Sequence, residues 1–221
     1  MEKEDNIDKY KEKNNKIIDL DNEFKKKYFP ELKDVNLDSI QITTQGKYSI
    51  SNISASEKLV YLIKKYFKSD KLTITDATGN NGSDTIALGL NFLKVNSIEL
   101  DPLNYSVLEN NINVYNLTNV SLYLGDSIEI IPKLNQDVIY IDAPWGGSNY
   151  KENKSLKLYL GKYELSDIYN KFKSKTKLFV FKIPTNYDFT HFIQNTLLDK
   201  YYIHSFRQKD KVKFYLLFAP V

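Results

Sequence analysis

Residues 73–85 read Thr-Ile-Thr-Asp-Ala-Thr-Gly-Asn-Asn-Gly-Ser-Asp-Thr. A predicted strand at residues 72–75 runs here into a turn with two glycines, Gly79 and Gly82, and a helix is expected over residues 84–92. Glycine lets the backbone adopt positive φ and approach a ligand closely, and the helix beyond offers free N–H groups at its first turn. The segment therefore predicts a strand–turn–helix unit with a ligand-binding turn.

Strands and helices alternate through the rest of the chain. Short apolar stretches predict six further strands, at residues 95–100, 120–125, 138–141, 178–183, 201–206 and 212–218. Segments of helical length and period are found at residues 55–67, 84–92, 104–116, 127–134, 165–172 and 189–198. This alternation predicts a parallel sheet covered on both faces. Because only residues 207–211 join the last two strands, we expect those strands to form an antiparallel hairpin.

The predicted fold is therefore α/β, with a seven-stranded, mostly parallel sheet and a C-terminal antiparallel hairpin. This is the Rossmann-like architecture of class I methyltransferases, an analogy of fold that does not settle function. We expect this domain to span residues 54–221. Before it, helical apolar spacing through Ile17, Leu20 and Phe24 predicts a helical extension over residues 1–53, either a lid over a site or a mobile arm.

Composition limits the chemistry. The 221 residues are 42% hydrophobic and 27% charged, which is typical of a globular protein. There is no Cys and there are only two His residues, which argues against thiol catalysis, disulfides and a metal site. No apolar run reaches the roughly 18 residues of a transmembrane helix, and the charged residues 1–15 show no secretory signal. We expect a soluble, intracellular monomer that binds neither metal nor membrane, in the nucleus or the cytoplasm.

Acidic residues follow three successive predicted strands. Asp76 could pair with a ligand ammonium group, Glu99 with both ribose hydroxyls, and Asp126 with an adenine amino group. S-adenosylmethionine has such an ammonium group and NAD does not, and the G-x-G-x-x-G turn typical of NAD sites is missing. The pattern predicts an S-adenosylmethionine site, although each acid alone could be a helix N-cap. We include in this site the neighbouring Thr78, Gly79, Gly82, Thr85, Leu100 and Ser127.

The fourth strand of the predicted sheet leads into residues 142–150, Asp-Ala-Pro-Trp-Gly-Gly-Ser-Asn-Tyr. Pro144 ends the strand and stiffens the turn, and Trp145 is the only tryptophan in the chain. A planar base stacked on Trp145 would present its exocyclic amine to the methyl group, and Asp142 could hold that amine. Positioning supplies most of the rate of such an in-line displacement. We therefore predict catalytic roles for Asp142, Pro144 and Trp145, with Asp142 also contacting the cofactor.

These segments resemble the trimethylguanosine synthase family, which methylates N2 of 7-methylguanosine on capped RNA. Residues 142–150 are similar to the family's S/D-P-P-W-G-G-P-x-Y segment. Residues 46–51, Gly-Lys-Tyr-Ser-Ile-Ser, are similar to G-W-F-S-V-T, and residues 184–186, Pro-Thr-Asn, to P-R-N. The resemblance covers roughly residues 45–190 and implies that the partner is capped RNA or the cap nucleotide.

The resemblance also implies roles for acceptor-side residues. Trp145 would stack on the positively charged 7-methylguanine, a contact worth about 0.5–2 kcal/mol. Substrate contacts are implied for Ser49, Ser51, Tyr150 and Asn186. Two basic clusters would hold the triphosphate: the eight lysines between Lys151 and Lys177, and Arg207, Lys209, Lys211 and Lys213.

Three positions depart from the family pattern. Ala143 replaces the first Pro of P-P-W, Lys47 replaces a Trp, and Thr185 replaces an Arg whose phosphate contact Lys182 could supply. Two alternatives stay open. The first is an amino-methyltransferase of adenine N6 or of another amide or amine, since such enzymes carry a D/N-P-P-Y/F/W loop. The second is a catalytically dead cap-binding protein. The W-G-G continuation favours the cap enzyme, and the intact acidic residues favour activity.

Overall fold

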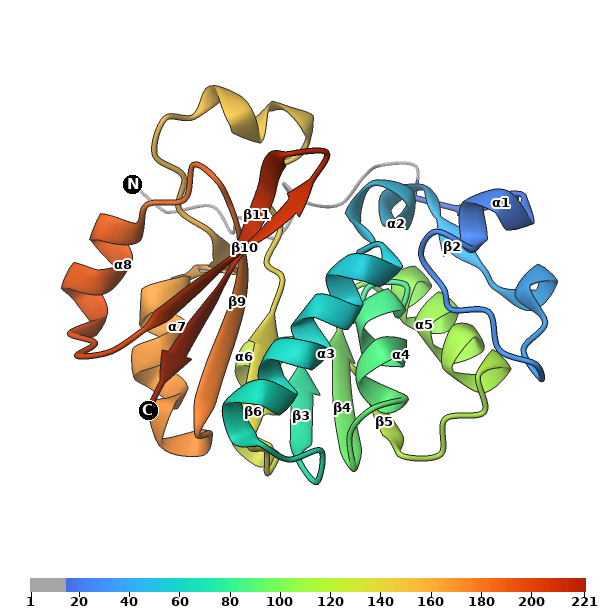
Figure 1. Cartoon of the computed structure of the whole chain (residues 1–221), viewed down its shortest axis with the longest axis horizontal. Coiled ribbons are helices and arrows are strands. Elements are labelled where there is room, and N and C mark those ends of the chain that lie inside the picture. The colour runs from blue at the N-terminus through green and yellow to red at the C-terminus, as the bar shows by residue number, and fades with distance from the viewer. Residues whose placement is uncertain (1–14) are drawn as a thin grey trace. The chain divides into compact units, whose positions relative to one another are not determined.

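The computed structural model describes residues 15–221 of the chain (Figure 1). Within this range the chain forms two compact units, residues 15–130 and residues 131–221. Seven strands form a mixed sheet, with parallel pairs in both units and an antiparallel hairpin at the C-terminus. The predicted α/β fold, with a seven-stranded, mostly parallel sheet and a C-terminal antiparallel hairpin, is therefore confirmed. Between residues 15 and 221 no helix is both long and apolar enough to cross a membrane.

The first unit is built on three parallel strands. In β3–β4–β5, Asp76 pairs with Ser97 and Glu99 with Leu124, so the strands end close to one another at one edge. Helix α4 packs against β3 and β4, and α3 packs against α4 (Figure 1). The elements in chain order are α3 (Ile53–Phe67), β3 (Thr73–Asp76), α4 (Ser83–Gly89), β4 (Lys94–Glu99), α5 (Pro102–Val114), β5 (Val120–Leu124) and α6 (Ser127–Ile130).

Local signals explain where these helices begin. Asn52 caps α3 by accepting a hydrogen bond from the Ala55 N–H, and Asp101 caps α5 just before Pro102. Helix α4 is different, because it follows Gly82 in the left-handed region and has no side-chain cap. Its first N–H groups therefore have no capping side chain, as a ligand-binding turn requires. The predicted helix over residues 127–134 is shorter, since Pro132 falls in the 3-10 turn Ile131–Lys133 that follows α6.

The predicted N-terminal helix is wrong for the residues that the structure describes. Instead, β1 (Ile17–Ile18) pairs antiparallel with β2 (Ile42–Thr43). The remaining elements before α3 are short: α1 (Asn22–Lys25), η2 (Leu37–Ser39) and α2 (Thr44–Ser49). Residues 1–14 of the predicted extension lie outside the described residues. Tertiary burial decides this segment, because it outweighs the weak helical pattern of the local sequence.

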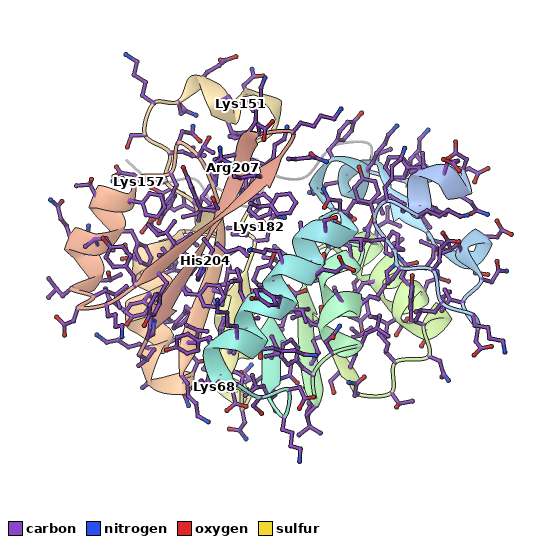
Figure 2. All side chains as sticks on the ribbon, viewed as in Figure 1. Lys68, Lys151, Lys157, Lys182, His204 and Arg207 are labelled. Carbon is purple, nitrogen blue, oxygen red and sulfur yellow. The ribbon has the colours of Figure 1, made fainter. Side chains whose placement is uncertain are left out.

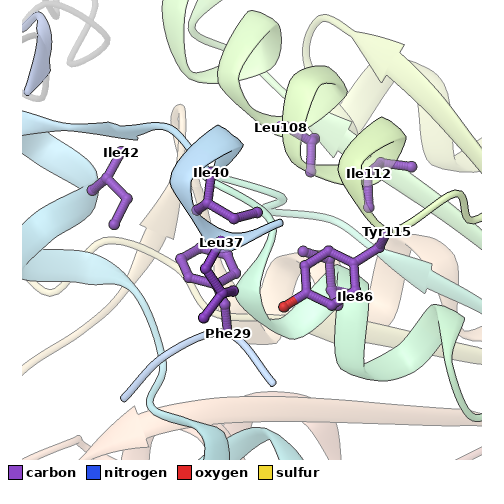
Figure 3. Close-up of a cluster of buried hydrophobic side chains, with 8 residues drawn as sticks. All are labelled: Phe29, Leu37, Ile40, Ile42, Ile86, Leu108, Ile112 and Tyr115. Atoms are coloured by element: carbon purple, nitrogen blue, oxygen red, sulfur yellow. The ribbon is translucent and has the colours of Figure 1, made fainter. Parts of the chain in front are cut away.

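Residues 15–53 are packed onto the first unit and are not a mobile arm. One buried apolar cluster joins this segment to α4 and α5 (Figure 3): Phe29, Leu37, Ile40, Ile42, Ile86, Leu108, Ile112 and Tyr115. The Tyr115 hydroxyl donates to the Pro30 carbonyl at 2.6 Å. The Asn111 side chain accepts from Gln41 N and donates to Gln41 O, each at 2.9 Å. The domain boundary at residues 53 and 54 stays a prediction.

The second unit joins parallel and antiparallel strands. Strand β6 (Val138–Ile141) is parallel to β9 (Leu178–Pro184), and β11 (Lys211–Pro220) is antiparallel to both β9 and β10 (Tyr202–Gln208). The expected C-terminal hairpin is thus confirmed. The other elements of the second unit are η3 (Ile131–Lys133), η4 (Ser148–Glu152), β7 (Tyr159–Leu160), β8 (Tyr163–Glu164), α7 (Leu165–Phe172), η5 (Lys173–Lys175) and α8 (Phe189–Thr196).

Strand β9 lies at the centre of this second unit. All seven of its residues are buried, and all but Lys182 are apolar, which is typical of a strand covered on both faces. Phe179 and Phe181 stack with ring centres 5.5 Å apart, and Phe192 of α8 meets Phe181 edge-on at 5.4 Å. A charged Lys182 inside such a strand needs a partner.

Candidate functional site

The Gly-rich turn is tied to the end of the neighbouring strand. Gly79 N donates to Ile98 O at 2.8 Å, and Gly82 N donates to Gly79 O at 2.9 Å. A Cβ on Gly79 would lie 2.5 Å from the Ser97 hydroxyl, and Gly82 has φ +92°. Both glycines are therefore required, one by close packing and the other by backbone conformation.

Asp76, Thr78 and Thr85 are joined by hydrogen bonds at this turn. Asp76 accepts from Thr78 N at 3.1 Å and from the Thr85 hydroxyl at 2.7 Å, and its side chain is buried. The carboxylate therefore braces the turn. Its proposed contact with a ligand ammonium group stays a prediction.

Glu99 is the residue of this edge best suited to hold a ribose. One carboxylate oxygen accepts from Asn80 N at 2.7 Å and the other from Asp101 N at 2.8 Å. Burial raises the pKa of Glu99, while the two backbone N–H groups favour its charged form. Each oxygen keeps a lone pair for a further donor. Two fixed acceptor oxygens fit a pair of ribose hydroxyls.

The third acidic residue also shapes its own loop. Asp126 accepts from Ile128 N at 2.8 Å, as a helix-capping residue does, and the Ser127 hydroxyl donates to Ala77 O at 2.5 Å. At the same edge, Leu100 and Leu124 are 55% and 50% exposed, although both are apolar. The sequence does not predict that Leu124 is exposed, because a leucine at a strand end is usually expected to be buried. Such side chains can cover the faces of a purine.

Residues around α2 contact the Gly-rich turn. Thr43 N donates to Asn81 Oδ1 and the Thr43 hydroxyl to Asn104 Oδ1, both at 2.8 Å in the interior. A Cβ on Gly46 would lie 1.8 Å from Asn81 Oδ1, so only glycine fits there. The sequence pattern did not reveal this network. Its one signal is the pair of asparagines beside the glycines.

The two serines predicted to bind substrate differ in their surroundings. The Ser51 side chain is buried, and its hydroxyl donates to Asp84 at 2.6 Å. Ser49 is exposed, and its hydroxyl donates to Gln45 O at 3.1 Å in the helix itself. Ser51 thus anchors the chain to α4, and substrate contacts by either serine stay predictions. The neighbouring Tyr48 is 81% exposed.

On the second unit, Asp142 follows β6 and forms an ion pair with Lys182 of β9. Lys182 Nζ lies 2.6 Å from Asp142 Oδ2, with side-chain exposures of 9% and 18%. The suggestion that Lys182 replaces the missing phosphate-binding arginine is therefore wrong, because its ammonium group is buried against a carboxylate. Lys182 is buried, whereas Lys151 is exposed; both are labelled in Figure 2.

Trp145 is held by Tyr150. Their rings meet edge-to-face, with centres 5.1 Å apart at 69°. Trp145 Nε1 is buried and has no hydrogen-bond partner among the described residues. Burial also raises the pKa of the Tyr150 hydroxyl. In the sequence between Trp145 and Tyr150, Gly146 and Gly147 have φ values of +91° and +82°. The glycines allow the loop to turn Tyr150 back onto Trp145.

Asn186 fixes the chain that follows this loop. Its amide donates to Tyr150 O at 2.8 Å and to Asn153 O at 2.6 Å, and Leu156 N donates to Asn186 O at 2.8 Å. Asn186 Oδ1 is buried and unpartnered within residues 15–221. The structure thus shows Asn186 holding residues 150–156, and its contact with a cap stays a prediction.

A buried carboxylate, that of Glu164, holds Tyr187, the residue after Asn186. Glu164 accepts from the Tyr187 hydroxyl at 2.9 Å and from Ser166 N at 2.6 Å, and it caps α7. Burial and the nearby Glu164 charge raise the pKa of Tyr187. The sequence pattern carries no signal for this role of Glu164.

The second unit is net positive, whereas the rest of the chain is net negative. Residues 131–221 hold 15 of the chain's 31 Lys and Arg but only 8 of its 28 Asp and Glu. Lys151, Arg207 and most of the other basic residues between 151 and 213 are exposed (Figure 2). This surface is suited to bind a polyanion. Within the described part of the chain, no group of three His, Cys, Asp or Glu residues could hold a metal ion.

The fold is that of a class I methyltransferase. A Porphyromonas gingivalis W83 protein provisionally assigned as a methyltransferase superposes with a TM-score of 0.59 at 20% identity, over 79% of this chain and 41% of its own. The precorrin-6y C5,15-methyltransferase of Geobacter metallireducens GS-15 superposes with a TM-score of 0.55 at 15% identity, over 77% of this chain and 89% of its own. These likenesses show the fold.

The family follows from the sequence. The profile of the RNA cap guanine-N2 methyltransferase family matches residues 71–220, and the chain belongs to that family. An uncharacterised protein of Acanthamoeba polyphaga mimivirus, L320, is 36% identical over 141 residues, which are 62% of this chain. The chain spans 54% of the length of that relative.

Proposed function

We propose that this protein transfers methyl groups from S-adenosylmethionine to the exocyclic N2 of 7-methylguanosine in RNA caps. The product would be 2,7-dimethylguanosine after one transfer and 2,2,7-trimethylguanosine after two. Membership of the RNA cap guanine-N2 methyltransferase family supports this substrate class. The observation that carries the proposal is the loop after β6, in which Trp145, the only tryptophan, is braced by Tyr150 and follows the Asp142 carboxylate.

The donor-side residues fit S-adenosylmethionine. Three polar features suit a ribose and an amino acid: the uncapped N-terminus of α4, the two fixed oxygens of Glu99, and Asn80 Oδ1, which has no hydrogen-bond partner within residues 15–221. Glu99 would accept from the ribose hydroxyls, and Asp126 would accept from the adenine amino group. When bound, the cofactor supplies a methyl group on a positively charged sulfur.

The acceptor-side residues suit a flat, positively charged base. The Trp145 ring would stack on 7-methylguanine by a cation–π contact of about 0.5–2 kcal/mol. Asp142 would accept a hydrogen bond from the exocyclic amine and orient its nitrogen. Asp142 would hold N2 toward the methyl group that the bound donor would supply, and the proton lost from N2 would pass to solvent. Orientation contributes most of the acceleration.

The cap triphosphate and the RNA would bind the basic side chains of the second unit. The excess of seven positive charges in residues 131–221 supports this assignment. Such contacts release counterions, so affinity for capped RNA falls as salt is raised.

Mass spectrometry after incubation with labelled donor tests the proposal. The full chain is offered 7-methyl-GTP, GTP, capped RNA and adenine-containing DNA in parallel. We expect transfer to the two 7-methylated substrates and little to GTP. If GTP or adenine is the preferred acceptor, the protein is an amino-methyltransferase of another substrate, and the cap assignment is wrong. Cap binding without any transfer would indicate a catalytically dead cap-binding protein.

A further inference from the structure

Lys182 is a buried lysine paired with Asp142, the first residue of the proposed acceptor loop, residues 142–150. It comes next to Asp142 in the sheet, because Ile141 of β6 pairs with Phe181 of β9 and the two charged residues follow on parallel strands. The 2.6 Å distance between Lys182 Nζ and Asp142 Oδ2, with little exposure of either side chain, makes this a largely desolvated ion pair. Such a pair keeps its charges close together and weakly screened.

Aromatic rings hold the Lys182 side chain in place. Lys182 Nζ lies 5.2 Å from the centre of the Phe214 ring. Phe214 itself stacks on Phe206, with ring centres 4.7 Å apart and planes at 13°. Because β9 and β11 are paired along seven residues, this support is rigid. The ammonium group is therefore confined beside Asp142.

The pair changes what Asp142 offers to a base. A lone carboxylate attracts a cationic base more strongly than a neutral base of the same shape. An ammonium group only 2.6 Å away cancels most of that attraction at the distance of a bound ligand. The 7-methylguanine ring is cationic and guanine is neutral, so their discrimination depends on the net charge of this site.

We propose that Lys182 is a specificity-determining residue: by neutralising Asp142, it limits the preference of the acceptor site for a cationic base over a neutral one. This inference rests on the proposed function, since it takes the base to bind beside Asp142. Lys182 acts through Asp142 and touches no reacting atom.

A second lysine–aspartate pair provides a matched control. Lys177 and Asp137 precede the same two strands at their other ends, and Lys177 Nζ lies 2.7 Å from Asp137 Oδ1. The Lys177 side chain is 69% exposed. Removing this lysine changes the charge of the chain equally but far from the acceptor loop.

The test measures dissociation constants of GTP and 7-methyl-GTP for the full chain in the presence of S-adenosylhomocysteine. Quenching of the single tryptophan, Trp145, reports binding. We expect the ratio of the GTP constant to the 7-methyl-GTP constant to rise at least about threefold in Lys182→Met. In Lys182→Arg and Lys177→Met the ratio should stay within about twofold of wild type, because both variants keep the positive charge beside Asp142. An unchanged ratio in folded Lys182→Met overturns the proposal.

Asp142→Asn provides a test of the opposite sign. It removes the Asp142 charge and keeps the Lys182 charge, so the same ratio should fall at least about threefold. This variant decides the question if Lys182→Met does not fold, because a ratio at the wild-type value would then overturn the proposal. Failure of the wild-type chain to bind either nucleotide would instead contradict the proposed function, and the two failures are therefore distinct.

Discussion

Asn81 Oδ1 accepts a hydrogen bond from Thr43 N at 2.8 Å, which joins the segment before α2 to the middle of the Gly-rich turn. The two residues are 38 positions apart and both lie in the interior. The turn at the end of β3 is therefore shaped partly by a segment that precedes the whole sheet. We expect changes in that segment to reach the cofactor site.

Gly46→Ala tests this connection. The added Cβ would lie 1.8 Å from Asn81 Oδ1, so the helix and the turn must move apart. Overpacking of this kind typically costs about 1–3 kcal/mol. We expect a lower free energy of unfolding in urea and weaker binding of S-adenosylhomocysteine by calorimetry. Tyr48→Ala, on the same helix and 81% exposed, should leave unfolding nearly unchanged. Equal stability of the two variants would mean that the turn does not depend on this contact.

The two parts of the first unit differ in how well their sequence predicts them. Residues 73–85 carry local signals, a strand, two glycines and a helix start, and the structure forms all three. Residues 15–43 carry a helical spacing of apolar residues, yet Ile17 and Ile18 form a strand and Phe29 packs on α5. Contacts with residues distant in the sequence decide this segment, and a local pattern does not contain them.

Site residues show the same division. Glu99 and Asp142 could be found because a strand end followed by an acid is a local pattern. The partners of Asp142 and Tyr150 could not, because Lys182 and Asn186 reach them from another strand and another loop. Sequence resemblance placed Asn186 at the substrate, whereas its amide is used on two backbone carbonyls. Residue type and order therefore predicted the edge of the sheet, and side-chain pairing required the structure.

Glu99→Gln should weaken cofactor binding and change its pH dependence. The side-chain amide would direct an N–H toward Asn80 N or Asp101 N, both of which are donors. We expect at least about a tenfold loss of affinity, which equals about 1.4 kcal/mol. Burial raises the pKa of Glu99, so its carboxylate gains a proton at a higher pH than an ordinary glutamate does. Wild-type binding should therefore begin to weaken at that higher pH as the solution is acidified.

Calorimetric titrations with S-adenosylhomocysteine across the acidic range measure this effect. Binding needs the ionised carboxylate, so affinity should fall as the pH falls through the pKa of Glu99 in the folded protein. The raised pKa places this loss at a higher pH than for an ordinary glutamate. Glu99→Gln cannot ionise, so its weaker affinity should vary less with pH. Identical pH profiles for the two proteins would exclude Glu99 as the titrating group.

Trp145→Ala separates the acceptor from the donor. The indole ring is the proposed stacking surface, and no described contact makes it part of the Gly-rich turn. We expect kcat/KM for 7-methyl-GTP to fall at least about tenfold, near the upper range of a cation–π contact. The dissociation constant of S-adenosylhomocysteine should stay close to wild type. A parallel loss of both would show that Trp145 supports the fold, and circular dichroism would then show altered unfolding.

Asn186→Ala should loosen the acceptor loop without unfolding the unit. The variant removes hydrogen bonds to Tyr150 O and Asn153 O, each worth about 0.5–1.5 kcal/mol. Hydrogen exchange should speed up in residues 148–156 and stay slow in β9, whose residues are buried. Asn170→Ala is a matched control, because it removes one exposed hydrogen bond, to Asn195 O at 2.8 Å. If residues 148–156 exchange equally slowly in both variants, other contacts hold the loop, and Asn186 would then be open to the substrate role that its resemblance implies.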